Sequence, residues 1–362
     1  MGPLDGIRVI ELASTAPCAF AGALLADLGA DVVRIDRPQH TAPAADAPPP
    51  ADPLARGKRS AALDLKDPAD RDTLLGLLDR ADVFLEGLRP GGCERLGLGP
   101  DVLRERNPRL VYARVTGWGQ QGPWAERPGH DLTFLAMAGA LDADRAPGAA
   151  PLPPSTYLSS FAGGGMLQVL GVLAALTERA SSGLGQTVDA AMVDGAALLT
   201  VMIRQWRRAP GNHTVTDAPF YTTYACKDGR HLAVAAIEPR FWTALLTGLG
   251  LADRPLPDRA DPAAWPQLQR LLAEVFLERE SEHWIKTFDG LDACVVPVLT
   301  VAEAAEHPAL HGRRAYTDVA GLPQPSPAPR FDRTPTEIRR PAPVPGRHTA
   351  EILTEWTAPA PH

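Results

Sequence analysis

The chain has 362 residues, of which 45% are hydrophobic and 22% are charged, and its formal net charge is −7 at pH 7. This length is sufficient for one large domain or two moderate ones, each with a substantial core. The negative charge argues against a nucleic-acid-binding protein and against a polybasic membrane anchor. No run approaches the ~20 apolar residues that a membrane span requires, and the N-terminus lacks the pattern of a signal peptide.

The cysteines indicate a reducing compartment. Four cysteines are scattered along the chain, and no pair has the CxxC spacing of a metal site. We therefore expect free thiols, a cytoplasmic location, no metal and no prosthetic group. The sequence also lacks a Gly-x-Ser-x-Gly elbow, a Walker A motif and a His-Glu-x-x-His motif, so hydrolases of those types are not indicated.

The first forty residues have the pattern of a β-turn-α-β unit. A strand at residues 7–13 is followed by a break at Ala16-Pro17, a helix over Phe20–Leu28 and a short strand at residues 32–35. This pattern predicts the opening of a parallel α/β sheet. Nucleotide-type ligands bind at the carboxyl ends of such strands, here Ala13–Pro17 and Asp36–Pro38. A GxGxxG fingerprint is absent.

The α/β alternation continues to about Val115 and two long apolar helices follow it. We expect a loop at 39–53, strands at 60–65, 83–85 and 110–115, and helices at 68–80, 164–178 and 188–206. The two long helices are too apolar to be exposed on all sides. Residues 1–208 are therefore predicted to form a large α/β domain.

A smaller α+β domain is predicted at residues 218–315, after a linker at 209–217. Its expected elements are strands at 220–226 and 231–236, joined by a turn at 227–229, and helices at 239–250 and 262–280. Residues 316–362 are predicted to return to the large domain, with a Pro-rich extended stretch at 323–345 and a final helix at 349–356 that packs on it.

His130 is the leading catalytic candidate. It lies in Gly129-His130-Asp131, seven residues after the Gly-rich stretch 117–123. Because imidazole titrates near working pH, such a residue can accept a proton from carbon and return it. The alternative is a capping or surface histidine in a loop.

Two further features have both a chemical and a structural interpretation. Gly163-Gly164-Gly165 precede a helix, and their amides could hold a phosphate or an enolate oxygen, although such glycines are more often packing devices. Glu238 follows a strand and precedes a helix, so it either caps that helix or reaches an active site.

The whole chain resembles the α-methylacyl-CoA racemases of the family III CoA-transferase superfamily. The resemblance is carried by the segments 2–12, 25–38, 86–91, 117–131, 159–166, 186–199 and 218–221 and by the Glu238 segment. It implies an interlocked homodimer in which each subunit has a large Rossmann-like domain and a small domain. It also implies that the coenzyme A part of an acyl-CoA substrate lies on the large domain.

The resemblance assigns roles to particular residues. His130 matches the histidine that moves the α-proton, and Glu238 matches an acidic residue of the small domain that supports the site. The positions that match coenzyme A contacts are Arg37, Leu63, Asp64, Leu65, Lys66, Gly87, Leu88, Arg89, Arg95 and Gly129–Phe134. Coenzyme A needs cationic groups for its phosphates; the alternative for the basic residues of the first hundred positions, Arg56 and Arg59 included, is solvated surface charge.

Ser160 departs from the family pattern, because the resemblance places an aspartate at this position. That aspartate is the second acid/base in the racemases and the acyl-carrying residue in the transferases. A serine hydroxyl without an adjacent base is too weakly acidic for either role at neutral pH. Asp131 is a possible substitute, although the resemblance implies that it holds the site together.

Several functions therefore stay open for this sequence. The leading hypothesis is enolate formation at His130, with racemisation altered by the loss of the aspartate. The alternatives are a secondary-metabolism enzyme that performs epimerisation, elimination, isomerisation or cyclisation on a carbonyl compound without coenzyme A, a CoA-transferase, and a catalytically dead homologue.

Overall fold

A computed structural model describes residues 2–38, 52–143, 150–154, 158–206, 208 and 217–357. The chain forms two compact units. Unit 1 comprises Met1–Asp142, Leu152–Thr200 and Ala309–His362, and unit 2 comprises Ala143–Pro151 and Val201–Pro308. Of the predicted linker at 209–217, only Asp217 belongs to the described residues, and most of the loop expected at 39–53 lies outside them as well.

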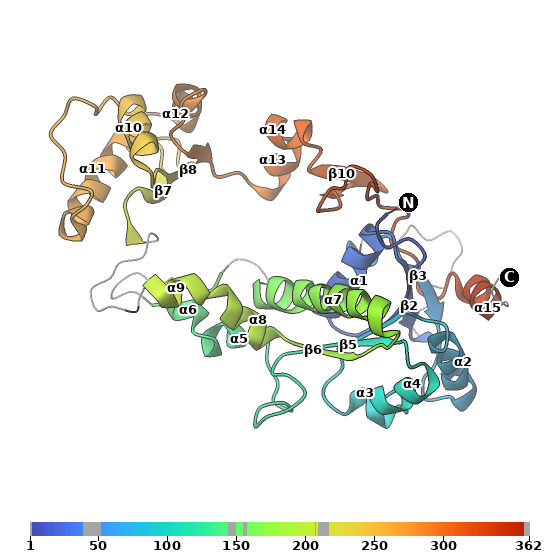
Figure 1. Cartoon of the computed structure of the whole chain (residues 1–362). Helices are drawn as coiled ribbons and strands as arrows, with labels where there is room; N and C mark the ends of the chain where they lie inside the picture. Colours follow the sequence, from blue (N-terminus) through green and yellow to red (C-terminus); the bar gives the residue numbers. More distant parts are fainter. Residues whose placement is uncertain are drawn as a thin grey trace. The chain divides into compact units, whose positions relative to one another are not determined.

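Unit 1 is built on a six-stranded parallel sheet, which confirms the predicted α/β class (Figure 1). Its strands are β1 (Arg8–Leu12), β2 (Asp31–Asp36), β3 (Arg59–Ala62), β4 (Val83–Glu86), β5 (Val111–Thr116) and β6 (Thr187–Ala191). They lie in the order β3-β2-β1-β4-β5-β6. The order reverses between β1 and β4, and a crevice opens at the carboxyl ends of the strands at such a switch point.

Helices cover both faces of this sheet. One face packs against α1 (Ala16–Asp27) and α7 (Leu167–Ser182) through Val83, Leu85 and their neighbours. The other face, which carries Phe84, packs against α2 (Pro68–Leu78), α4 (Pro100–Arg106) and the final helix α15 (Thr349–Thr357). Alternate residues of each strand therefore enter opposite cores, as expected for a sheet covered on both sides.

The helix α7 is preceded directly by a π-helix, η2 (Leu158–Met166). The combined segment Leu158–Ser182 is long and apolar enough to cross a membrane by length and composition, so the expectation that no segment meets this criterion was wrong. The helix nevertheless packs along β5 and β6, and its buried Gln168 donates a hydrogen bond of 2.9 Å to the Ala113 carbonyl. One face of this helix therefore packs against the sheet, while Met166 and Leu170 on it are exposed.

Two boundaries differ from the sequence expectation. Residues 188–191 were predicted within a helix, but they belong to β6, because Thr187–Ala191 pair with β5 and complete the sheet. The helical part is divided into α8 (Met192–Leu199) and α9 (Val201–Trp206). Pro17 was expected to interrupt the chain before the first helix, yet it lies in the first turn of α1, where its missing N–H leaves no hydrogen bond unmade.

The remaining elements of unit 1 are short. They are α3 (Gly92–Arg95), α5 (Asp131–Met137), α6 (Ala140–Ala143), α14 (Pro308–Gly312) and the hairpin β10 (Tyr316–Val319) and β11 (Leu322–Pro325). The hairpin replaces the start of the extended stretch predicted at 323–345. Beyond it the chain returns to strand β3, where the Thr349 hydroxyl accepts a hydrogen bond from the Ala62 amide.

Unit 2 contains a three-stranded antiparallel sheet of β7 (Tyr221–Ala225), β8 (His231–Ala235) and β9 (Val295–Pro297). The helices α10 (Pro239–Gly248), α11 (Trp265–Leu277), α12 (Ser281–Phe288) and α13 (Val301–Glu306) and the 3-10 turn η4 (Pro262–Ala264) complete it. The sequence indicated β7, β8 and the first two helices but not β9. Its core is aromatic and includes Tyr224, Phe276 and Trp284.

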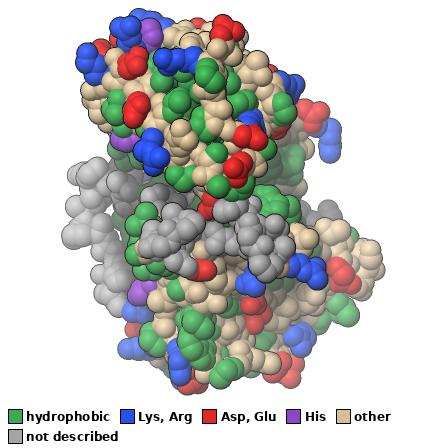
Figure 2. Space-filling model, turned by 90° about the vertical axis from the view of Figure 1, so that its left-hand side faces the viewer, with side chains coloured by type: hydrophobic (Ala, Val, Ile, Leu, Met, Phe, Trp, Pro, Cys, Tyr) green, Lys and Arg blue, Asp and Glu red, His purple; other side chains and the backbone are tan. Residues whose placement is uncertain are grey.

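Basic and acidic side chains are interspersed on the face drawn in Figure 2, rather than gathered into a region of one sign. This distribution agrees with the modest net charge of −7. An extended basic surface of the kind that binds nucleic acid is not visible on that face.

Candidate active site

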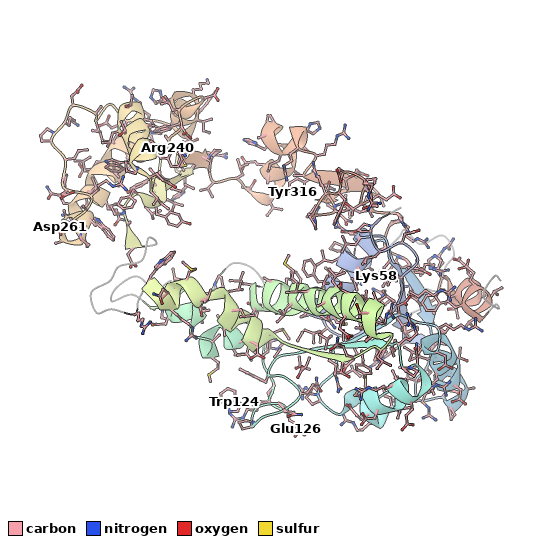
Figure 3. The ribbon with its side chains drawn as sticks, in the orientation of Figure 1. Lys58, Trp124, Glu126, Arg240, Asp261 and Tyr316 are labelled. Carbon is pink, nitrogen blue, oxygen red and sulfur yellow. The ribbon has the colours of Figure 1, made fainter. Side chains whose placement is uncertain are left out.

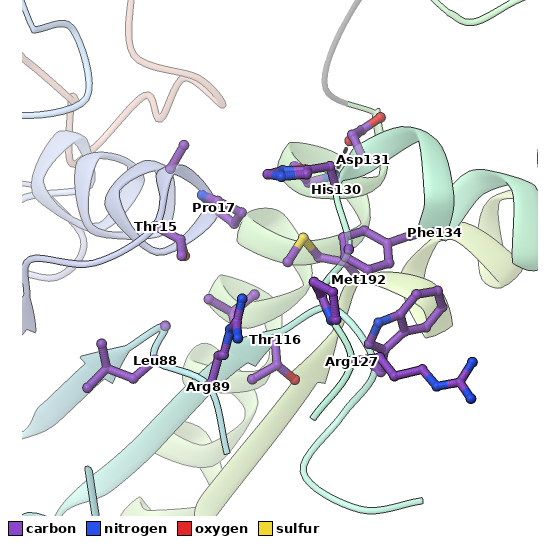
Figure 4. A pocket seen from close by; sticks show the side chains of 18 of the residues that line it. Thr15, Pro17, Leu88, Arg89, Thr116, Arg127, His130, Asp131, Phe134 and Met192 are labelled. Atoms are coloured by element: carbon purple, nitrogen blue, oxygen red, sulfur yellow. Dashed lines mark hydrogen bonds between the residues drawn. The ribbon is translucent and has the colours of Figure 1, made fainter. Parts of the chain in front are cut away.

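A cavity of about 660 Å³ lies at the carboxyl ends of β1, β4 and β5, where the strand order reverses (Figure 4). The turn after β1 contributes Thr15–Pro17, the loop after β4 contributes Gly87–Pro90, and the segment after β5 contributes Val115–Trp118. The first of these segments is one of the two strand ends that the sequence indicated. All the residues that line this cavity belong to unit 1.

His130 lines this cavity from the start of α5. It is the N-cap residue of that helix and has extended backbone angles. Its backbone is fixed by Thr133, whose hydroxyl accepts from the His130 amide at 3.0 Å and donates to the His130 carbonyl at 2.7 Å. In Figure 4 the imidazole extends from α5 toward Pro17 at the start of α1. The ring is therefore presented to the cavity while its backbone is held.

Asp131 lines the same cavity, but its carboxylate also anchors the π-helix. The Ser160 amide donates a hydrogen bond of 2.6 Å to Asp131 Oδ1, and the Ser159 hydroxyl donates one of 2.8 Å to the same oxygen. The two chemical segments of the sequence, 129–131 and 159–166, are thereby joined. These hydrogen bonds agree with a structural role for Asp131, which stays a prediction.

Ser160 is 8% exposed and lines the cavity near His130. Its backbone amide is bound to Asp131, whereas its hydroxyl forms no hydrogen bond with the described residues. A nucleophilic serine needs a neighbouring general base. Among the described residues, no such base is hydrogen-bonded to the Ser160 hydroxyl, because Asp131 binds the backbone amide instead.

The three glycines 163–165 do not line the cavity, which argues against the ligand-binding alternative for their amides. All three are buried inside η2. A side chain on Gly163 would come within 3.0 Å of the Ala196 amide nitrogen in α8, and one on Gly165 would come within 2.7 Å of the Pro17 carbonyl oxygen in α1. The glycines therefore allow η2 to pack closely between two helices, which was the structural alternative.

The loop after β4 supplies the cavity with Gly87, Leu88 and Arg89, all three predicted from the sequence. Gly87 lies close to the turn after β1, since a Cβ added there would be 2.5 Å from the Thr15 hydroxyl oxygen and one of the two side chains would have to move. Figure 4 shows Arg89 pointing into the space between Thr15 and Thr116.

The other predicted residues lie elsewhere. Arg37 follows β2, the segment 63–66 follows β3 and Arg95 ends α3; none of them lines the cavity, although the first two lie at the same edge of the sheet. Glu238 belongs to unit 2, where it is the exposed N-cap residue of α10 and its side chain makes no capping hydrogen bond.

Three basic residues of the first hundred positions are neither ligand-facing nor solvated. Lys58 is completely buried and pairs with Glu11 at 2.5 Å (Figure 3). Arg56 pairs with Asp27 at 2.6 Å, and Arg59 bonds to Asp31 at 2.6 Å. Burial makes these ion pairs part of the scaffold, so the expectation of surface charge was wrong for Arg56 and Arg59.

Several lining residues carried no chemical signal in the sequence. Trp118 and Phe134 pack edge to face at 4.8 Å, and the Phe134 ring fills the space left by the missing side chains of Gly117 and Gly129. Met192 begins α8 and reaches the cavity only because β6 ends at Ala191. The positions of these residues follow from the sheet, so knowing where β5 and β6 end would have identified them.

The ionisable side chains that line the cavity in the described part of the chain are Arg89, Arg127, His130 and Asp131. The Arg127 guanidinium lies 4.4 Å from the centre of the Trp124 ring and points away from His130 (Figure 4). Arg127 belongs to the loop on which Trp124 and Glu126 are labelled in Figure 3. Burial raises the pKa of the Cys18 thiol well above its usual value, which excludes a thiolate nucleophile beside Pro17.

The comparisons with known proteins agree with this architecture. The family model described as CoA-transferase family III matches residues 4–349. This chain belongs to the CoA-transferase family III. It is 43% identical to the α-methylacyl-CoA racemase of Mus musculus, over 98% of this chain and 93% of the relative. It is 41% identical to the α-methylacyl-CoA racemase of Homo sapiens, with the same coverage.

A solved structure shares the fold as well. The CAIB/BAIF family protein from Brucella suis superposes with a TM-score of 0.85 at 26% identity, and the match covers 98% of this chain and 99% of that chain. The resemblance to the racemases within CoA-transferase family III, stated from the sequence, is thus confirmed. The roles of His130, Ser160 and Glu238 stay predictions.

Proposed function

We propose that this protein is an acyl-CoA racemase-like isomerase in which His130 removes the α-proton of an acyl thioester. The observation that carries the proposal is the position of the imidazole in a cavity of about 660 Å³ at the strand-order reversal of unit 1. The 43% identity to a protein named α-methylacyl-CoA racemase, over nearly the whole chain, supports the substrate class.

The proposed step needs only a base and a carbon acid. Neutral imidazole accepts the proton from the α-carbon, and the electron pair of the broken C–H bond moves onto the thioester oxygen to form an enolate. The imidazolium then returns a proton to the same carbon. A correctly placed general base of this kind accelerates such a step by about 100- to 10,000-fold.

In our proposal this protein differs from a two-base racemase in the group that faces the opposite side of the enolate. Racemisation by two bases needs a competent acid/base on each face, and the side chain at position 160 is a hydroxyl. The carboxylate of Asp131 is bound to the Ser160 amide and the Ser159 hydroxyl, which supports a structural rather than a catalytic role. We therefore propose fast exchange at one face and slow inversion. The same absence of a carboxylate at 160 disfavours acyl transfer through an anhydride.

The finer assignments belong to the same proposal. The residues Gly87–Arg89 and Gly129 line the cavity and are proposed to contact coenzyme A; Arg37, Leu63–Lys66 and Arg95 lie outside the cavity lining and are proposed on the resemblance alone. Glu238 is proposed to support the site. A cytoplasmic homodimer is proposed as well; exposed apolar side chains of unit 1 support it, among them Met166 and Leu170 on the helix η2–α7 and Leu198 on α8.

The experiment is α-proton exchange in D2O, with the (2R) and (2S) forms of a 2-methylacyl-CoA as separate substrates. Mass spectrometry follows deuterium uptake, and chiral analysis follows inversion. The wild type is expected to exchange one enantiomer faster than it inverts it. His130→Ala should lose exchange by about 100-fold or more, because the base is removed.

A matched variant tests the second face. Ser160→Asp should raise the ratio of inversion to exchange, since it supplies a carboxylate where the hydroxyl stands. Exchange that persists unchanged in His130→Ala would refute the proposal. If the wild type takes up no deuterium from either enantiomer but exchanges a carbonyl compound without coenzyme A, the secondary-metabolism alternative replaces it; if nothing exchanges, the catalytically inactive alternative does.

A further inference from the structure

A buried carboxylate ends strand β4 directly before the cavity loop. Glu86 is 0% exposed, and its two oxygens have different partners. Oε1 accepts a hydrogen bond of 2.6 Å from Arg114 Nε, and Oε2 accepts one of 2.7 Å from the Leu88 backbone amide. One carboxylate thus connects the neighbouring strand β5 with the second residue of the loop.

The same guanidinium also binds the far end of that loop. Arg114 is 4% exposed, and its terminal nitrogens donate to both oxygens of Glu94 in α3, at 2.8 and 3.2 Å. Its planar face lies 5.4 Å from the centre of the Tyr112 ring. Glu86 precedes the segment 87–91 and Glu94 follows it, so one side chain on β5 fixes both ends of the segment.

The position of this loop is also limited by its contact with the turn after β1. Gly87 approaches the turn after β1 so closely that a Cβ would lie 2.5 Å from Thr15 Oγ1 and 3.0 Å from Ser14 Oγ. Burial raises the pKa of Glu86, and the opposing effects of Arg114 and the Leu88 amide favour the charged form that accepts both bonds. A shift of the loop would break the Leu88 bond or open the contact with Thr15.

We propose that Glu86 and Arg114 form a clamp that pre-orders the loop Gly87–Pro90 for binding of the acyl-CoA substrate. Both are positioning residues, because neither lines the cavity, and they act through Leu88 and Arg89, which do. The proposal rests on the proposed function for the identity of the ligand. It adds that ligand affinity, rather than the proton-transfer step, depends on a buried ion pair outside the site. Pre-ordering of a loop improves affinity because less freedom is lost on binding.

The test uses two variants and one control. Arg114→Met removes the guanidinium and leaves Glu86 buried without its charge partner. Glu86→Leu/Arg114→Met removes both charges, which buried cores often tolerate, but it still leaves the Leu88 amide without its acceptor. The control Arg179→Met breaks a partly buried pair, Arg179–Asp82 at 2.8 Å, beside the opposite end of the same strand; the arginine is nearly as buried as Arg114, although Asp82 is more exposed than Glu86.

Two readouts are measured on the full-length protein. Calorimetry with a 2-methylacyl-CoA should show an affinity loss of about tenfold, about 1.4 kcal/mol, in both clamp variants. The control should bind like the wild type. Hydrogen exchange by mass spectrometry should show faster exchange in the peptide covering residues 85–92 in the double variant without ligand. At saturating substrate, the rate of deuterium uptake should be retained.

The outcomes separate the clamp from the proposed function. Unchanged affinity and unchanged exchange in the peptide 85–92 would overturn the clamp. An equal affinity loss in Arg179→Met would also overturn it, because general destabilisation would then explain the effect. If the wild type binds no acyl-CoA, the proposed function is wrong, while exchange in the loop peptide still decides whether Glu86 and Arg114 order it.

Discussion

The crossing of η2 and α8 positions Ser160, and it depends on two glycines in backbone contact. A Cβ added to Gly195 of α8 would lie 2.0 Å from the Gly163 carbonyl oxygen and 2.3 Å from its Cα. Ordinary contacts of a Cβ begin at 3.4 Å. Because both partners are backbone atoms, no side chain can rotate away. The variant Gly195→Ala therefore has to separate the two helices by about an ångström.

The expected cost follows from this geometry. Extra methyl groups in packed cores destabilise by about 1–3 kcal/mol when side chains can adjust. Here the neighbour is rigid, so we expect about 3 kcal/mol or more, lowered by at most about 1 kcal/mol from the better helix propensity of alanine. Gly76 in α2 is the matched control, since an added Cβ there meets nothing within 4 Å. Gly76→Ala should gain up to about 1 kcal/mol.

Urea unfolding followed by circular dichroism measures both variants. Gly195→Ala should lower the unfolding midpoint, and Gly76→Ala should hold or raise it. The α-proton exchange assay adds a functional readout. Separation of η2 from α8 moves Ser160 and strains the hydrogen bond that its backbone amide donates to Asp131. If Gly195→Ala is as stable as Gly76→Ala, close backbone packing does not hold η2 in place, and our explanation of the glycines 163–165 is wrong.

Two further predictions concern the C-terminal return and the quaternary structure. Burial lowers the pKa of His348, whose Nδ1 accepts a hydrogen bond of 3.2 Å from the Ser60 amide. The unfolded chain then binds the proton more readily, so the free energy of unfolding should fall as the pH drops below about 6.5. In His348→Asn, this part of the decrease in unfolding free energy with falling pH should be missing. Plots of unfolding free energy against pH that run parallel for the wild type and the variant between about pH 7.5 and about pH 5 would contradict the prediction. Light scattering should give about twice the 38.6 kDa of one chain, and a monomer at micromolar concentration would contradict the homodimer.

The parallel sheet was predictable because its strands are short apolar runs bounded by turns and alternate with helices. Strand β6 was not, because Thr187–Ala191 run into α8 without a Gly or Pro between them, and only the pairing with β5 makes these residues a strand. Pro17 misled for a related reason. A proline breaks a helix in its interior but not in its first turn, and the sequence does not say which position applies.

The site was predictable where the side chains are chemically distinctive. His130, Asp131, Ser160 and the segment Gly87–Arg89 were named from the sequence, and all of them line one cavity. Met192 and Phe134 were not named as candidates on their own chemistry, because an apolar residue is usually a core residue and only the ends of the strands assign it to a cavity. The reverse error affected Arg56 and Arg59, which are buried themselves and whose acidic partners are distant in the sequence.

The way in which Ser160 is held bears on how a single base can remain useful. Its backbone amide, not its hydroxyl, is bound to Asp131, so the location of residue 160 does not depend on which side chain it carries. His130 is likewise positioned through its own backbone, by Thr133. Asp131 joins the two segments through the Ser160 amide, so neither the imidazole nor the hydroxyl is needed to hold the other segment, and a change of side chain at position 160 leaves these backbone contacts in place. An enzyme built in this way can lose acid/base function on one face of an enolate and keep proton abstraction on the other.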